Sequence, residues 1–92
     1  MQGFFYMYYV YILYSENHNR FYIGQTNDLS NRLFRHNSGF EKSTAPYKPW
    51  TLVGSIEKHS RSEAMILEKK LKNLNSEDLK KFITKHLVGR EA

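Results

Sequence analysis

Two short runs rich in tyrosine and β-branched residues, 7–14 and 20–26, lie on either side of the polar segment 15–19. Aromatic and β-branched side chains favour strands, and a short polar segment between two such runs favours a turn. The start of the chain therefore predicts an antiparallel β-hairpin, and the rest of the fold has to be built around it.

The side chains of this hairpin divide between two faces, because successive residues of a strand point in opposite directions. Four apolar residues occupy alternating positions: Val10, Ile12, Phe21 and Ile23. They share one face only if Tyr11 pairs with Gly24 and Leu13 with Tyr22. The opposite face then carries the phenols beside Gly24, whose missing side chain leaves room for a ligand or a backbone. The alternative is that Gly24 marks a bulge and the tyrosines cover a second hydrophobic layer.

The remaining chain predicts three helices and a third strand. Asn27 or Asp28 can cap a first helix, and Ser60 with Glu63 matches a capping box before a second. The expected elements are a helix to about residue 37, a loop over 38–50, a strand over 51–57, a helix after residue 60 and a helix over about 76–88. The order β-β-α-β-α-α predicts an α/β (α+β) fold, in which helices flank a three-stranded, mostly antiparallel sheet.

Composition limits the class of protein and its partners. The 92 residues, 40% of them hydrophobic, are expected to form one domain over 1–92. There is no cysteine, so disulfides and thiolate zinc sites are excluded. The net charge of +5 and pI of about 9.5 favour an anionic partner such as nucleic acid. Without a long apolar run or a signal-peptide pattern, we expect no membrane association and a cytoplasmic location.

Four polar side chains stand beside the apolar stripes of the predicted helices. Arg32 and His36 are four residues apart and share one helix face. Glu63 and Glu68 both flank the stripe of the second helix, and the capping box gives a structural role to Glu63 only. Ordinary solvated helix faces carry similar residues, so the spacing alone leaves both interpretations open.

Taken together, these motifs resemble the GIY-YIG nuclease superfamily. The triplet 9–11, Tyr-Val-Tyr, is similar to the first half of the family motif, and the triplet 22–24, Tyr-Ile-Gly, matches the second. Arg32 and His36 fall at the family's arginine and histidine positions, and the segment 64–68 resembles the helix that ends in its metal-binding glutamate. Several elements in order over about residues 8–75 form a specific signal. The resemblance is to small single-domain members, similar to the N-terminal cleavage domain of the excision-repair endonuclease subunit.

This resemblance implies an endonuclease that hydrolyses DNA phosphodiester bonds with one divalent metal ion. Glu68 would hold one Mg²⁺ (or Mn²⁺), completed by water and a phosphate oxygen, which suits a hard cation. Arg32 would bind the scissile phosphate and stabilise its transition-state charge. Tyr11 and Tyr22, helped by His36, would activate the attacking water, and the resemblance does not identify which tyrosine is the base.

DNA is the expected partner, with a role in DNA repair or in processing branched DNA, and a partner protein or a homodimer would supply specificity. Four residues of the loop over 38–50 are candidates for phosphate contacts: Lys42, Ser43, Thr44 and Lys48. Gly24 is the structural glycine of the motif, and Gln25 stands where some relatives carry a lysine that helps to activate water.

Two other functions are compatible with the residues. In the first, the chain is a nucleic-acid-binding module that has the same fold as the nucleases but cleaves weakly or not at all. Alternatively, the tyrosine face would stack single-stranded RNA, which requires that no helix covers Tyr9, Tyr11 and Tyr22.

Overall fold

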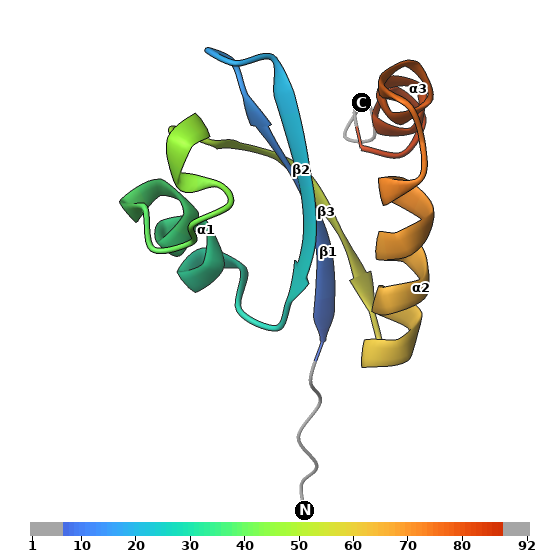
Figure 1. Cartoon of the computed structure of the whole chain (residues 1–92). Coiled ribbons are helices and arrows are strands. Elements are labelled where there is room, and N and C mark those ends of the chain that lie inside the picture. Colours follow the sequence, from blue (N-terminus) through green and yellow to red (C-terminus); the bar gives the residue numbers. More distant parts are fainter. Residues whose placement is uncertain (1–6, 88–92) are drawn as a thin grey trace, which may run out of the picture.

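The computed structural model describes residues 7–87, and its elements follow the expected order (Figure 1). They are β1 (Tyr8–Ser15), β2 (Arg20–Thr26), α1 (Leu29–Ser38), the 3₁₀ turn η1 (Ala45–Tyr47), β3 (Thr51–Lys58), α2 (Arg61–Lys72) and α3 (Ser76–His86). The expected domain over 1–92 and the expected end of the last helix at residue 88 extend beyond the described residues. Within 7–87, no helix has the length and apolar character that crossing a bilayer requires.

The central strand of the sheet is β1, which pairs antiparallel with β2 on one side and β3 on the other. Its pairing with β2 has the predicted register, with Tyr11 opposite Gly24 and Leu13 opposite Tyr22. On the β3 side, the register shifts between Ile12 and Leu13. The predicted α+β class and hairpin register are thereby confirmed, and β2 is left as an edge strand.

Helices cover both faces of this sheet, α1 on one side and the α2–α3 pair on the other (Figure 1). The core under α2 and α3 contains these buried residues: Val10, Ile12, Ile23, Ala64, Leu71, Leu79 and Ile83. The core under α1 contains Tyr11, Leu13 and Trp50, with Tyr22, Leu29, Leu33, Tyr47 and Leu52 packed against them. The alternation of residues along the hairpin thus separates two cores, as expected from its period of two.

Capping interactions set where α1 begins and ends and where α2 begins, the two helices that carry the candidate site residues. The Asp28 carboxylate accepts a hydrogen bond from the backbone N–H of Asn31, and Gly39, at φ 82°, ends α1 in the left-handed conformation that glycine tolerates. The Ser60 hydroxyl accepts a hydrogen bond from the backbone N–H of Glu63 at the start of α2. The predicted caps are therefore present. Of the two candidates for the N-cap of α1, Asp28 fills the role and Asn27 does not.

Candidate active site

Gly24 lies directly against the phenol of Tyr11. A methyl group at Gly24 would lie 2.6 Å from Tyr11 Oη, 2.8 Å from Tyr11 Cζ and 3.0 Å from Tyr22 Cε2. The space beside Gly24 is therefore filled by Tyr11 itself, and is not a notch open to a ligand. Because real contacts do not approach this closely, any larger side chain at position 24 has to displace the phenol.

We expect Gly24→Ala to destabilise the fold by about 1–3 kcal/mol, the usual cost of overpacking a filled interior. Chemical denaturation followed by circular dichroism measures this change. Gly54→Ala is the matched control, because the three atoms nearest to its added methyl group all belong to the Leu87 side chain, at 3.1 Å and beyond. Equal stability of the two variants would contradict the close packing at Gly24.

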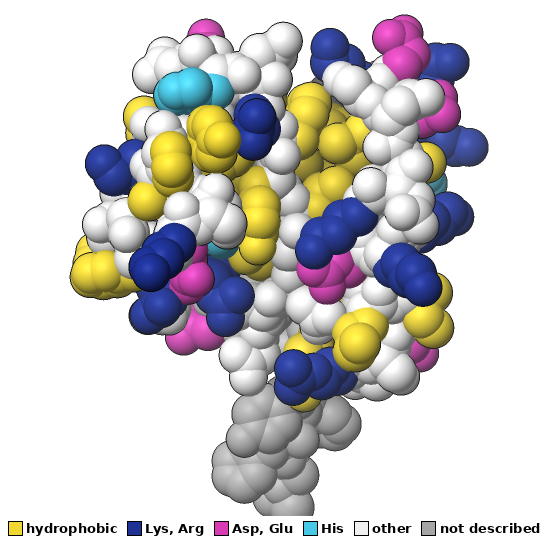
Figure 2. Space-filling view, viewed as in Figure 1, with side chains coloured by type: hydrophobic (Ala, Val, Ile, Leu, Met, Phe, Trp, Pro, Cys, Tyr) yellow, Lys and Arg dark blue, Asp and Glu magenta, His cyan; other side chains and the backbone are white. Residues whose placement is uncertain are grey.

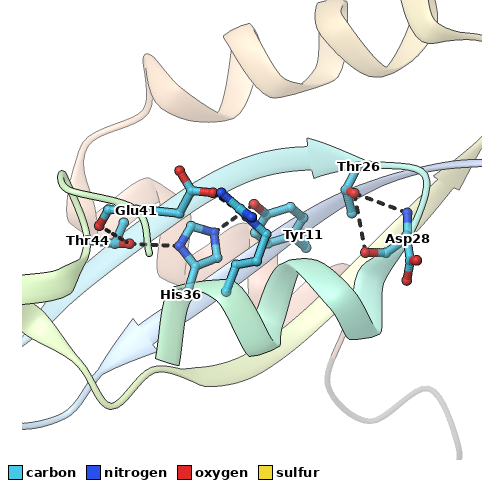
Figure 3. Close-up of polar contacts among 7 residues, drawn as sticks. Tyr11, Thr26, Asp28, His36, Glu41 and Thr44 are labelled. Atoms are coloured by element: carbon cyan, nitrogen blue, oxygen red, sulfur yellow. Dashed lines mark hydrogen bonds and ion pairs between the residues drawn. The ribbon is translucent and has the colours of Figure 1, made fainter. Parts of the chain in front are cut away.

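A chain of hydrogen bonds leads from the Tyr11 phenol into the loop after α1 (Figure 3). Tyr11 Oη lies 2.9 Å from His36 Nε2, and His36 Nδ1 lies 2.8 Å from Thr44 Oγ1. The Thr44 hydroxyl donates its one hydrogen to the carbonyl of Glu41, so it accepts from the Nδ1–H of His36. Nε2 of His36 is then the acceptor, and Tyr11 donates its proton to it.

Burial sets the protonation states of this pair. It raises the pKa of the Tyr11 phenol above its ordinary value of 10.0, and the neighbouring Tyr22 raises it further, while the charge and hydrogen bonding of Arg32 lower it. Burial also lowers the pKa of His36 from 6.5, with Glu41 acting in the opposite direction. For Tyr11, desolvation outweighs the effect of the Arg32 cation. At neutral pH, Tyr11 keeps its proton and His36 is neutral.

Thr44 does not lie where a DNA contact requires it. Its side chain is only 1% exposed, and its hydroxyl is engaged by His36 and by the Glu41 carbonyl. Lys42, Ser43 and Lys48 are exposed, as phosphate contacts demand. Thr44 instead fixes the tautomer of His36, a role that depends on a contact between helix and loop and has no signal in the residue pattern.

Glu68, on α2, reaches the hairpin from the face of the sheet opposite to α1 (Figure 1). Its Oε1 accepts a hydrogen bond of 3.0 Å from the amide of Gln25, the residue after Gly24. Its Oε2 lies 2.8 Å from Nζ of Lys72, four residues later on α2. The carboxylate lines a hollow of about 470 Å³, so it is tied to the edge strand and still open to solvent.

This carboxylate fits a single hard cation. No group of three or more His, Asp or Glu residues within 7–87 is placed to hold a metal. Glu68 would be the one protein ligand, and Mg²⁺ accepts such a site because water and phosphate oxygens complete its shell. The Lys72 ammonium, on a side chain that is 52% exposed, would leave Oε2 when the cation binds.

Arg32, from α1, and residues of α2 meet at the end of β2. Arg32 lines a second hollow, of about 230 Å³, together with Gln25 and Arg61. Gln25 and Arg61 also line the hollow of Glu68, so the two hollows are adjacent. In the view of Figure 2, the sheet edge lies in a groove between the α1 side and the α2–α3 side, with Lys and Arg side chains on both walls.

The tyrosines of the hairpin do not form an open stacking platform. Tyr11 is 1% exposed, and α1 packs across its face of the sheet through Leu29 and Leu33. Tyr22 is half-buried, its ring centroid 6.2 Å from that of Tyr11 and 4.9 Å from that of His36. An exposed aromatic surface for single-stranded RNA is therefore excluded.

Two contacts and one shared lining at this edge were not expected from the residue pattern. Gln25 and Lys72 contact Glu68, and Arg61 lines the same hollow as Arg32. The spacing of Glu68 and Lys72 is a weak signal for their ion pair, since residues four apart on a helix are neighbours. Gln25 and Arg61 carry no such signal, because their partners lie on other elements.

Comparisons with known proteins agree with this arrangement. The model of the GIY-YIG catalytic domain matches residues 7–82. Among solved structures, the chain is similar to the UPF0213 protein BH0048 from Bacillus halodurans, determined by solution NMR, with 31% identity and a TM-score of 0.58. This match covers 87% of the chain and 85% of that protein. The search of curated proteins found no match. The residues matched by the family model include both tyrosine triplets, Arg32 and Glu68, and the chain belongs to the GIY-YIG catalytic domain family.

Proposed function

We propose that this protein is a metal-dependent endonuclease that hydrolyses DNA phosphodiester bonds, in repair or in the processing of branched DNA. Membership of the GIY-YIG family supports the nuclease class. The observation that carries the proposal is that Arg32 and Glu68, from helices on opposite faces of the sheet, line two adjacent hollows that share Gln25 and Arg61. A partner protein or a homodimer would supply specificity for a DNA structure.

Glu68 would hold one Mg²⁺ or Mn²⁺ ion. A bound ion supplies Lewis-acid stabilisation of the charge on a phosphate oxygen. Arg32 would direct its guanidinium at the same phosphate, where a planar fork of donors matches the geometry of the oxygens. The charge of the transition state is thus met by groups already in place before the reaction.

Tyr11 and His36 would take up the proton of the attacking water. As the water attacks phosphorus, its proton would pass to Oη of Tyr11, a residue that is 1% exposed and would have to be uncovered when DNA binds. The Tyr11 proton would pass at the same time along the 2.9 Å contact to Nε2 of His36. This path needs no free phenolate, so the raised pKa of Tyr11 is no obstacle to it. Tyr22, half-buried beside Tyr11, would position the water. Lys42, Ser43 and Lys48 would contact phosphates farther along the DNA.

His36 accepts a proton only when it is neutral, so cleavage should fail in acid. Because the pKa of His36 is lowered from 6.5, we expect kcat to be level near neutral pH and to fall with a midpoint below 6.5. The same shift makes the unfolded chain bind this proton more readily, so stability should also be lost as pH drops below 6.5. The pH profiles of kcat and of Tm measure the two effects.

His36→Gln provides the control for that profile. Glutamine does not titrate, so the acid limb should disappear while kcat falls by about 10²-fold from the lost proton acceptor. An unchanged acid limb in this variant would assign the titration to another group.

The direct test of the proposed function is nicking of supercoiled plasmid with Mg²⁺, compared with the same reaction in chelator. Relaxed product that forms only with the metal supports a hydrolase. A second candidate, a binding module that retains the fold without cleavage, is favoured by one observation: both oxygens of Glu68 are engaged, by Gln25 and Lys72. DNA binding without any nicking would select that candidate.

A further inference from the structure

Two arginines line one hollow whose lining contains no carboxylate. Arg32 comes from α1 and Arg61 from the first turn of α2. Among residues 7–87, ion pairs join Arg35 to Glu41 and Lys72 to Glu68, and neither Arg32 nor Arg61 takes part in one. Like charges beside the same space repel each other, and an anion between them removes that repulsion.

The lining of this hollow of about 230 Å³ is rich in hydrogen-bond donors. It consists of Tyr8, Gln25, Thr26, Asn27, Arg32 and Arg61. No Asp or Glu is among these residues. The two guanidinium groups, the two amides and the Tyr8 hydroxyl can donate to an anion, whereas the Thr26 hydroxyl already donates to the carbonyl of Asp28. Guanidinium is the side chain best matched to phosphate oxygens.

The hollow lies next to the one that Glu68 lines. Arg61 and Gln25 line both, and Arg61, Lys69 and Lys72 are the cations beside Glu68. Four cationic side chains thus face a single carboxylate along this end of β2. A polyanion with one phosphate at Glu68 can therefore place a neighbouring phosphate in the adjacent Arg32–Arg61 hollow.

We propose that Arg61 binds a second backbone phosphate, next to the one that is cleaved, and so sets the register of the DNA strand at the active site. The proposal rests on the proposed function for the position of the scissile phosphate. Arg61 is a positioning residue in this assignment, whereas Arg32 contacts the reacting group. The chemical target of Arg61 is a phosphodiester of the polynucleotide backbone, whatever the base sequence.

A substitution at Arg61 should leave the fold intact. The Arg61 side chain is exposed, and the cap of α2 is made by the Ser60 hydroxyl and the backbone of Glu63. Alanine also favours the helical conformation at this position. Arg61→Ala is therefore a clean test variant, with Arg61→Lys to retain the charge without the planar fork.

The first measurement is binding of a short fluorescein-labelled DNA duplex in chelator, followed by anisotropy over a series of salt concentrations. We expect Arg61→Ala to raise Kd roughly tenfold, the effect of losing one charged hydrogen-bonding contact. The slope of log Kd against log salt should fall by about one. Arg20→Ala, which removes the same charge at the other end of β2, where Arg20 lies over the Tyr47 ring, should leave the slope unchanged.

The second measurement locates the phosphate. A neutral methylphosphonate is placed at each backbone position in turn, and binding is compared for the wild-type protein and for Arg61→Ala. At the partner phosphate, the wild type should lose affinity and the variant should not, because the two changes remove one interaction. We expect that position to adjoin the cleaved bond. A parallel loss in both proteins at every position would overturn the proposal.

These readouts separate the proposal from the proposed function. Binding in chelator needs no cleavage, so a protein that never nicks DNA still reports whether Arg61 contacts a phosphate. Where nicking occurs, Arg61→Ala should raise KM and change kcat little. A wild-type Kd and salt slope in Arg61→Ala, with an unchanged melting temperature, would remove Arg61 from the DNA interface whatever the activity.

Discussion

Glu68→Gln is expected to lower the rate of DNA cleavage by about 10³-fold, because it removes the one carboxylate available to hold the metal and its Lewis-acid contribution of several kcal/mol. DNA affinity should change little, since phosphates are bound by the cations around the groove. The measurement is the single-turnover rate with saturating protein, combined with anisotropy binding in chelator.

Two variants on the same helix serve as controls for this prediction. Glu63→Gln removes a carboxylate that is exposed in the first turn of α2 and should cleave at the wild-type rate. Lys72→Met keeps the Glu68 carboxylate and removes its ion pair, so it should bind Mn²⁺ more tightly than the wild type, as read by electron paramagnetic resonance. A fully active Glu68→Gln would end the assignment of the metal to Glu68.

Arg32→Lys is expected to lower the cleavage rate by about 10²-fold, the usual effect of removing one donor aimed at transition-state charge. Lysine preserves the positive charge but not the planar fork that binds two phosphate oxygens at once. The ground-state affinity for DNA should therefore remain close to that of the wild type. Initial rates over a range of substrate concentrations separate kcat from KM for this variant.

The matched control is Arg20→Lys, because Arg20 lies at the opposite end of β2 from Arg32 and outside both hollows. Its kcat should equal that of the wild type. If Arg32→Lys raised KM and left kcat intact, Arg32 would hold DNA without acting on the reacting phosphate.

Several features of the fold follow from local patterns. The alternation of Val10 and Ile12 with Tyr11 and Leu13 allows one pairing of the hairpin, and that pairing is present. Helix starts are equally local, since Asp28 and Ser60 act on backbone groups within three residues. Such contacts are close in sequence, so the residue pattern predicts them before any packing is known.

The candidate residues could also be identified from their motifs. Their burial and their contacts could not be predicted in this way. Arg32 and His36 share a helix face by spacing alone, and the resemblance adds Glu68. How deeply each side chain is buried depends on where the helices settle on the sheet. The expected DNA contact by Thr44 fails for this reason, because the loop packs its hydroxyl onto His36.

Periodicity along a strand or helix is a property of the chain itself, and it sufficed for the register, the two cores and the helix caps. The direction of the proton between Tyr11 and His36, and the approach of Glu68 and Arg61 to the edge of β2, arise only when α1 and α2 pack on opposite faces of one sheet. The physical reason is desolvation and distance: the pKa of a buried phenol and the field of two arginines depend on neighbours that lie far away in the sequence.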